Sequence, residues 1–344
     1  MMSYCFKNLV FEGGGAKGIA YLGAMEVLEK KDILKNIERI GGTSAGAINA
    51  LLIGLNYKGN ELKTLLMDLN FKDFLDDSPG FMRDLRRVSK KYGWYKGDRF
   101  HRWIKSLVEK KTGNPNSTFG EIYDIKKEEK FKEIYFIGAN ISTGFAEVYS
   151  HKNYSSMPVA DAVRISMSIP LFFAAIRKKD GDVCVDGGLI NNYPVKLFDR
   201  EKYVQVDRRI PKYYKKYNKK LKETNHKKNI WIYNKETLGF RLDSAKEIAV
   251  FRNHKEPDHK KIESLFNYTS CLISAVFNIQ SSMHLHSDDW KRTIYIDTLG
   301  VSTFDFGLNK ENKLKLIESG KNCTKKYFEW YDKLKRLVNK PQIH

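Results

Sequence analysis

The chain has 344 residues and a net charge of +20, and 42% of its residues are hydrophobic and 13% aromatic. It can bury one large core, or a core with an appended subdomain, which predicts a soluble globular protein. Because no apolar stretch reaches the roughly 18 residues of a membrane-spanning helix and the N-terminal residues lack the zones of a signal peptide, we expect a cytoplasmic protein.

Two strand-to-helix corners open the chain. Residues 4–11 predict a short strand that ends at a glycine run, and residues 18–31 predict a helix with apolar residues three and four positions apart. Residues 37–40 predict a second short strand, and residues 45–55 an apolar helix. Since both strands turn directly into helices, the two corners can face one another.

Strands and helices continue to alternate after the second corner. We expect mostly helices over residues 60–130, strands over 132–141 and 146–151, a helix over 158–169 and a buried strand over 183–185. Pro170 would stop the helix before it. This alternation predicts an α/β layered sheet with active groups at the C-terminal ends of strands.

The part from residue 208 onward is the basic end of the chain, because it alone contributes a charge of +14. Residues 208–228 hold ten Lys and Arg, one Glu and three interleaved tyrosines. This run is either a solvated loop or a contact surface for anions. As a contact surface it favours anionic lipid headgroups, and nucleic acid is the less favoured partner.

Two helices are expected further along this basic part. The first carries an apolar stripe made of Leu265, Tyr268, Leu272, Val276, Ile279 and Met283. Such a stripe could cap an acyl channel or enter a bilayer, but stripes of this kind are usually core, and we expect core. Residues 313–338 predict a second amphipathic helix that packs on the main domain.

Both glycine-rich corners have residues suited to acyl transfer. Ser44 lies in Gly42-Thr43-Ser44-Ala45-Gly46, where small neighbours permit a sharp turn that exposes the hydroxyl. The first corner is Gly13-Gly14-Gly15-Ala16-Lys17-Gly18. Its backbone N–H groups at a helix N-terminus could stabilise the oxyanion of a tetrahedral intermediate. Lys17 could hold a phosphate headgroup or point to solvent.

Two nucleotide-binding interpretations of the glycine run are weaker. The run fits the dinucleotide fingerprint, with Glu38 twenty residues after Gly18. That interpretation leaves the serine corner without a role, and Glu38 would open its strand rather than close it. A Walker loop would need Gly-Lys-Ser or Gly-Lys-Thr, but Ile19 follows Gly18.

Asp186 is the candidate general base. It ends the apolar strand over 183–185 and precedes Gly187 and Gly188, and a buried strand end can make an aspartate basic enough for this role. Its structural alternative is a turn-forming Asp-Gly pair. His284 and His286 lie in a predicted helix and fit surface or capping positions better. Charged segments with no strand-end context hold His101, His151, His226, His254 and His259.

With these motifs in this order, the chain resembles the patatin-like phospholipase family. The similarity covers residues 12–18, 42–46 and 186–188, and it extends more weakly through 166–170, 191–194 and 300–306. In two places the sequence departs from the family pattern. Glu12 stands where Asp is common, which leaves the backbone donors untouched, and Met167 and Ile169 replace an alanine-rich pattern, which would narrow the acyl groove.

The resemblance implies a three-layer α/β/α fold with a central, mostly parallel sheet. Residues 4–207 would form the catalytic core, and residues 208–344 a basic, mainly helical part that completes or caps it. Ser44 would be the nucleophile and Asp186 the general base, with Gly14 and Gly15 as oxyanion donors. The substrate would be a phospholipid or other glycerolipid ester, cleaved at a membrane surface without metal or organic cofactor.

Three questions stay open at the level of sequence. A triad carboxylesterase would use His284 or His286 as the base. A catalytically idle membrane-binding or nucleic-acid-binding protein could keep the same fold. An activating ligand or protein is also conceivable, because some relatives of the family require one.

Overall fold

The computed structural model describes residues 4–76, 92–204, 208–223, 230–244, 261–283 and 288–333. Its centre is an eight-stranded sheet with the order β10-β9-β1-β2-β4-β8-β7, and β5 pairs with β4 beside this path. The strands are β1 (Asn8–Phe11), β2 (Arg39–Thr43), β4 (Glu133–Asn140), β5 (Phe145–Tyr149), β7 (Ile176–Arg177), β8 (Val183–Asp186), β9 (Thr237–Asp243) and β10 (Thr293–Asp297). A separate pair joins β3 (Gly93–Tyr95) to β6 (Leu171–Phe173).

The sheet is mixed, with a mostly parallel core. Strands β10, β9, β1, β2 and β4 run parallel to one another. Strand β8 runs antiparallel to β4, and so does β5, while β7 runs antiparallel to β8. The parallel part gathers the turns after β1 and β2 at one edge.

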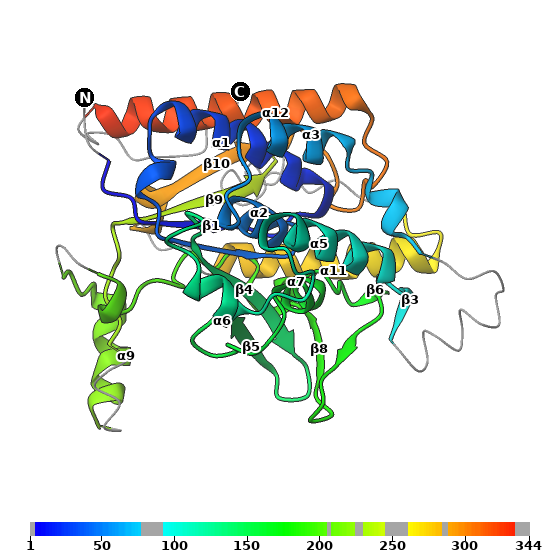
Figure 1. Cartoon of the computed structure of the whole chain (residues 1–344), viewed down its shortest axis with the longest axis horizontal. Coiled ribbons are helices and arrows are strands. Elements are labelled where there is room, and N and C mark those ends of the chain that lie inside the picture. The colour runs from blue at the N-terminus through cyan, green and yellow to red at the C-terminus, as the bar shows by residue number, and fades with distance from the viewer. Residues whose placement is uncertain are drawn as a thin grey trace.

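Helices surround the sheet (Figure 1). They are α1 (Tyr21–Lys30), α2 (Ala45–Gly54), α3 (Gly59–Asp68), α5 (Asp98–Thr112), α6 (Phe119–Asp124), α7 (Val159–Ser166), α8 (Gly188–Asn191), α9 (Lys212–Glu223), α11 (Leu265–Met283) and α12 (Lys310–Asp332). Helices α1 and α12 lie side by side, whereas α9 projects away from the sheet. None of the helices in the described ranges is both long and apolar enough to cross a bilayer.

Alternate strand residues point to the two sides of the sheet, as the two-residue period of a strand requires. Leu9 and Phe11 of β1 join the large cluster formed with α1, α2 and α12. Val10, between them, packs on the opposite side with Phe198 and Tyr203. The sheet is therefore buried on both faces, which explains the short, continuous apolar strands of the sequence.

Among the described residues the expected elements are present with shifted bounds, but the five strands β3, β6, β7, β9 and β10 were missed. The predicted strand over 4–11 is only β1, and the glycine run opens a 3-10 helix, η1 (Gly15–Ala20), before α1 begins. Strands β9 and β10 lie in the basic part and form the β1-side edge of the sheet. Helix α7 ends at Ser166, so Pro170 does not itself stop it.

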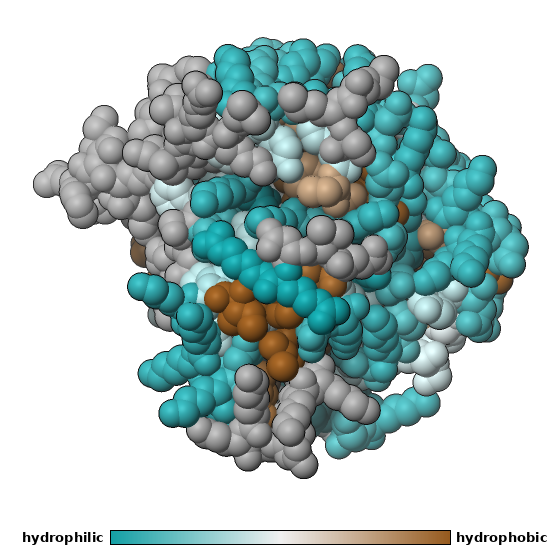
Figure 2. Space-filling view, turned by 90° about the vertical axis from the view of Figure 1, so that its left-hand side faces the viewer, coloured by the Kyte–Doolittle hydropathy of each residue, from teal (hydrophilic) through white to brown (hydrophobic). Residues whose placement is uncertain are grey.

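The basic run folds as helix α9 rather than as a loop over its described residues. Its inner face buries Tyr214 and Asn218. The Asn218 side chain forms two hydrogen bonds of 2.8 Å with the Trp231 backbone, and the Tyr214 hydroxyl donates to Asp199. Figure 2 shows the side of the molecule on which α9 lies, where the coloured surface is mostly hydrophilic and the hydrophobic areas are small.

The expectation that the apolar stripe of α11 is core was wrong for three of its members. Tyr268, Leu272 and Ile279 are exposed, and the core side of the helix instead carries Ile273 and Phe277. Because α11 is apolar on two sides, its spacing alone could not tell which side packs against the domain. The side chains of Leu265 and Met283 lie outside the described residues.

Candidate active site

The two glycine-rich corners meet, as the sequence predicted. Strands β1 and β2 are parallel neighbours whose pairing ends with Phe11 opposite Gly42, so both following turns leave the same edge of the sheet. A Cβ placed on Gly13 would lie 3.1 Å from the Cβ of Ser44. The glycine run therefore lies directly against the serine.

Ser44 is held in a strained conformation at the start of α2. Its φ of 54° and ψ of −125° are unusual for a residue with a side chain, and such backbone strain costs about 1–3 kcal/mol. Its N–H donates to Ser166 Oγ over 3.0 Å, and Ser166 Oγ donates to the Ile137 carbonyl over 2.6 Å. These contacts hold the sharp strand-to-helix turn that the sequence predicted, but Ser44 is buried, with 2% of its surface exposed, so the prediction of an exposed hydroxyl was wrong.

The register of β4 brings Asp186 to Ser44 from the other side. On one side of β4, Thr43 pairs with Ile137, and on the other side Asp186 pairs with Gly138. Because β8 runs antiparallel to β4, its last residue, Asp186, lies beside Gly138 of β4, next to the position where β2 ends at Thr43. Gly187 is required here, since a Cβ would overlap the Ile137 carbonyl.

The two oxygens of Asp186 differ in their partners. Oδ1 accepts a hydrogen bond from the Gly188 N–H over 2.7 Å, whereas Oδ2 is buried without a hydrogen-bond partner within the part of the chain that the structure describes. Burial raises the pKa of Asp186 to about 7, and the nearby Ser44 hydroxyl and the Gly188 N–H oppose that rise.

The Ser44 hydroxyl does not bond to that free oxygen in this structure. Its Oγ donates instead to Met167 Sδ at 3.5 Å, a weak acceptor. Met167 follows α7 and is buried, so it forms a wall beside the serine. The hydroxyl must turn away from Met167 before its proton can reach Asp186 Oδ2.

Only part of the glycine run has unengaged backbone donors. The Gly13 N–H donates to the Asn192 carbonyl, Ala16 to Thr303 and Lys17 to Gly14, and Gly18 lies within η1. Among the described residues, the N–H groups of Gly14 and Gly15 form no hydrogen bond. Of the six predicted oxyanion residues, these two remain as donor candidates.

Position 15 requires glycine for two reasons, its backbone conformation and the lack of space for a side chain. Its φ is +53°, a region that residues with side chains rarely adopt. A Cβ here would overlap the Thr303 carbonyl, which already accepts from Ala16. The segment around Thr303 therefore fixes the outer side of the glycine run.

Glu12 joins the glycine run to β9. Its Oε2 accepts from the Leu242 N–H over 2.7 Å, and Arg241 Nε lies 4.0 Å from its Oε1. Burial raises the pKa of Glu12 to about 7, against the opposing effect of Arg241. This contact could not be predicted from the sequence, since β9 itself was missed.

Asn192 and Ser166 were also missed as site residues. Asn192 Nδ2 donates to the Gly13 carbonyl over 3.1 Å and its own carbonyl accepts from Gly13, so it fastens the glycine run to the turn after Asp186. Both residues lie in the segments of weaker family resemblance, which is the signal that could have found them.

The two histidines that the structure describes, His101 and His151, lie away from this arrangement. Among the described residues, none forms a hydrogen bond with Ser44 or Asp186: His101 faces Asp161 Oδ1 at 2.8 Å, and His151 stacks on Tyr123. His284 and His286 lie outside the described residues. Within the described ranges, no group of three or more His, Cys, Asp or Glu is placed to hold a metal ion.

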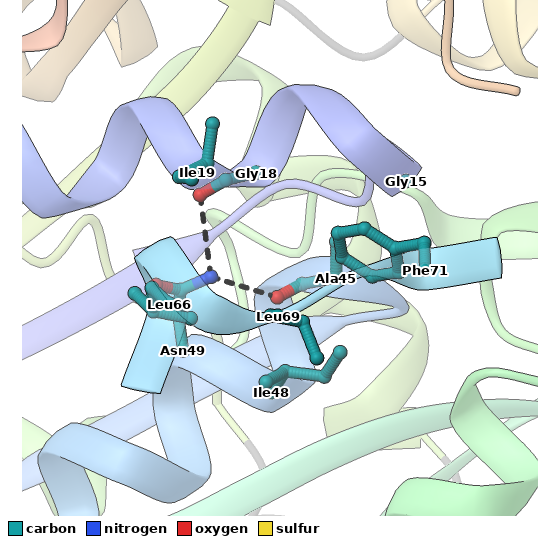
Figure 3. Close-up of a pocket in the computed structure, with 9 residues that line it drawn as sticks. All are labelled: Gly15, Gly18, Ile19, Ala45, Ile48, Asn49, Leu66, Leu69 and Phe71. Carbon is teal, nitrogen blue, oxygen red and sulfur yellow. Dashed lines mark hydrogen bonds between the residues drawn. The ribbon is translucent and has the colours of Figure 1, made fainter. Parts of the chain in front are cut away.

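An apolar pocket lies between η1 and α2, beside both corners (Figure 3). It is narrow, with room for about one water molecule, and it is lined by Gly15, Gly18, Ile19, Ala45, Ile48, Asn49, Leu66, Leu69 and Phe71. The Asn49 amide donates to the carbonyls of Ala45 and Gly18 over 3.0 and 3.4 Å. These bonds tie the two corners together at the pocket wall.

Comparison with known proteins identifies the family of the chain. Residues 9–199 match the family model described as patatin-like phospholipase. The uncharacterized protein YqhO of Bacillus subtilis (strain 168) is 29% identical over 333 residues, which are 93% of this chain and 97% of that protein. The probable lipid hydrolase 463L of invertebrate iridescent virus 6 is 24% identical over 192 residues, 56% of this chain and 63% of that protein.

A solved structure supports the fold. VipD from Legionella pneumophila superposes with a TM-score of 0.57 and 17% sequence identity, over 94% of this chain and 67% of that one. At this identity the similarity concerns the fold alone. The mixed sheet with helices around it is thus shared with that protein.

Proposed function

Because the chain belongs to the patatin-like phospholipase family, we propose that it is a lipid acyl hydrolase in which Ser44 is the nucleophile and Asp186 the general base. Its substrates would be glycerolipid esters, cleaved by a phospholipase A or lysophospholipase reaction. The observation that carries the proposal is the unpartnered Oδ2 of the buried Asp186, close to a strained serine. A carboxylate with a pKa near 7 is suited to general-base catalysis at neutral pH.

The first half of the reaction forms an acyl-enzyme. The Ser44 hydroxyl turns from Met167 toward Asp186 Oδ2 and transfers its proton there as Oγ attacks the acyl carbonyl carbon. The oxygen that becomes negative accepts hydrogen bonds from the Gly14 and Gly15 N–H groups, and one such donor is worth about 3–4 kcal/mol. Asp186 then returns the proton to the departing alcohol, which leaves as the lysolipid or glycerol fragment.

The second half releases the fatty acid. A water molecule gives its proton to Asp186 and attacks the acyl carbonyl, and the same donors stabilise the second oxyanion. Collapse of this intermediate breaks the bond to Ser44 Oγ, which recovers its proton from Asp186. The apolar lining beside Gly15 and Ala45 is suited to contact the start of the acyl chain, once side chains of the narrow pocket move to admit it.

Helix α9 is proposed as an electrostatic contact to anionic membranes. Its outer face carries five exposed lysines, Lys212, Lys215, Lys216, Lys219 and Lys220, together with the exposed Tyr217. Each lysine near an anionic surface contributes about 1 kcal/mol. We expect that replacing Lys212, Lys215, Lys216 and Lys219 by Gln weakens binding to anionic vesicles, more so at low salt. Unchanged binding at low salt would exclude this role.

The proposed activity is tested by fatty-acid release from mixed anionic and neutral phospholipid vesicles. Wild type and Ser44→Ala are compared after both are shown to fold with the same circular dichroism spectrum. Release by the wild type alone is expected. Equal release by both would mean that Ser44 is not the nucleophile.

A further inference from the structure

Helix α11 presents an uncharged apolar stripe to solvent. Residues 265–283 contain no Asp, Glu, Lys or Arg, in a chain of which 30% is charged. Tyr268, Leu272 and Ile279 are 52%, 46% and 57% exposed, and the exposed Ala275 lies between them. Residues spaced by three and four share one face of a helix, so these four form a continuous surface, the outer stripe.

The opposite face of α11 packs beside the candidate site. Ile273 and Phe277 are buried in an aromatic cluster with Phe172 and Phe306. The Phe277 ring lies against Gly188, where a Cβ would come within 2.9 Å of it, and Gln280 Nε2 donates to the Leu189 carbonyl over 3.2 Å. One helix therefore links the turn after Asp186 to an exposed apolar surface.

We propose that the outer stripe inserts into the surface of uncharged, zwitterionic lipid and holds the candidate site at that surface. The inference rests on the proposed lipid hydrolysis, because it names the physical form in which the substrate is met. An amphipathic helix can lie in the interface with its apolar side chains among the headgroups and upper acyl chains. Tyr268 suits the headgroup level, where one end of the ring is apolar and the other polar.

Because the outer stripe carries no charged residue, zwitterionic lipid is its favoured partner. A stripe without lysine or arginine gains nothing from anionic headgroups, so its binding depends on apolar burial and is insensitive to salt. A second copy of the chain is the poorer occupant. Stable protein interfaces bury about 1,200–2,000 Å² and use about 20–30 residues a side, whereas the outer stripe has four residues on one helix.

The test measures flotation with neutral phosphatidylcholine vesicles at low and high salt. The stripe variant Leu272→Ser/Ile279→Ser is compared with the matched control Leu314→Ser/Ile125→Ser. The control removes an exposed leucine on α12 and an exposed isoleucine at the end of α6. We expect the stripe variant to bind vesicles about tenfold more weakly, at either salt concentration, and the control to bind like wild type.

A second readout separates this inference from the proposed function. Hydrolysis of a soluble short-chain ester should be equal in wild type and stripe variant, while hydrolysis of vesicle lipid should fall with binding. Wild type that does not bind neutral vesicles, a stripe variant that binds as tightly as wild type, or a dimer that the stripe variant converts to monomer would each overturn the inference. If no variant cleaves any ester, the proposed function fails, and flotation still decides the role of the stripe.

Discussion

Two buried carboxyl groups lie near the glycine run and the serine, and they differ in what surrounds them. Glu12 and Asp186 both have a pKa raised to about 7, and burial is the main cause in each case. Glu12 accepts from the Leu242 N–H and faces Arg241, whereas Asp186 keeps Oδ2 without a partner among the described residues. A raised pKa therefore marks both acids, but only the free oxygen beside Ser44 suits a general base.

The largest expected difference between the two acids is in catalysis. Asp186→Asn should lower kcat for fatty-acid release by about 10²–10⁴-fold, since the amide cannot take up the Ser44 proton. The measurement is release from vesicles by protein with an unchanged circular dichroism spectrum. A variant that keeps more than half of the wild-type rate would remove Asp186 from the proposed mechanism.

The pH dependence of activity sharpens the same contrast. Because the base must be ionised, kcat/KM should fall about tenfold per pH unit below an apparent pKa near 7. Glu12→Gln should keep this acidic limb, since Glu12 is not the proposed base. If the acidic limb disappears in Glu12→Gln, the group that titrates is Glu12 and not Asp186, which would contradict the proposed base.

The pH dependence of stability should respond to both acids alike. Each carboxyl has a folded-state pKa raised above its ordinary value of 4.5 or 3.8, so folding favours its protonated form. The stability that this provides is present at pH 4 and is lost as pH rises through about 7, on the order of 3 kcal/mol for each group. Urea unfolding at pH 5 and pH 8 should show a smaller loss in Glu12→Gln and in Asp186→Asn; an unchanged loss in both would contradict the assigned pKa values.

The smallest expected effect is that of Glu12→Gln on kcat at pH 8. Gln can still accept from the Leu242 N–H, so the glycine run should keep its position and kcat should fall less than about tenfold. The matched substitution at the other acid is Asp186→Asn, purified in the same way and measured in the same assay. If kcat falls equally in both variants, Glu12 cannot be distinguished from Asp186, and the assignment of Asp186 as the general base would fail.

The sequence predicted the two corners because their signals are local. Small residues around Ser44 and the run from Gly13 to Gly18 identify turns without reference to distant strands. The strand before Asp186 was also visible as an apolar segment. What could not be predicted was its antiparallel direction, which depends on pairing with β4 and sets the level at which Asp186 meets the serine.

The remaining errors also concern long-range packing. Strands β9 and β10 were missed, and with them the contacts of Glu12 to Leu242 and Arg241. The spacing of α11 predicted a helix, yet which of its two apolar faces is core depended on Phe277 meeting Gly188. Periodicity reports that a face is apolar, and only the tertiary structure decides whether another element covers it.

The most direct test of the central claim is covalent labelling by a fluorophosphonate, followed by intact-protein mass measurement and peptide mapping. The reagent phosphonylates an activated serine without requiring a lipid surface or substrate recognition. We predict one adduct at Ser44 in wild type and Glu12→Gln, formed at least about 100-fold more slowly in Asp186→Asn. An adduct at another residue, or equal labelling rates in wild type and Asp186→Asn, would contradict a serine nucleophile activated by Asp186.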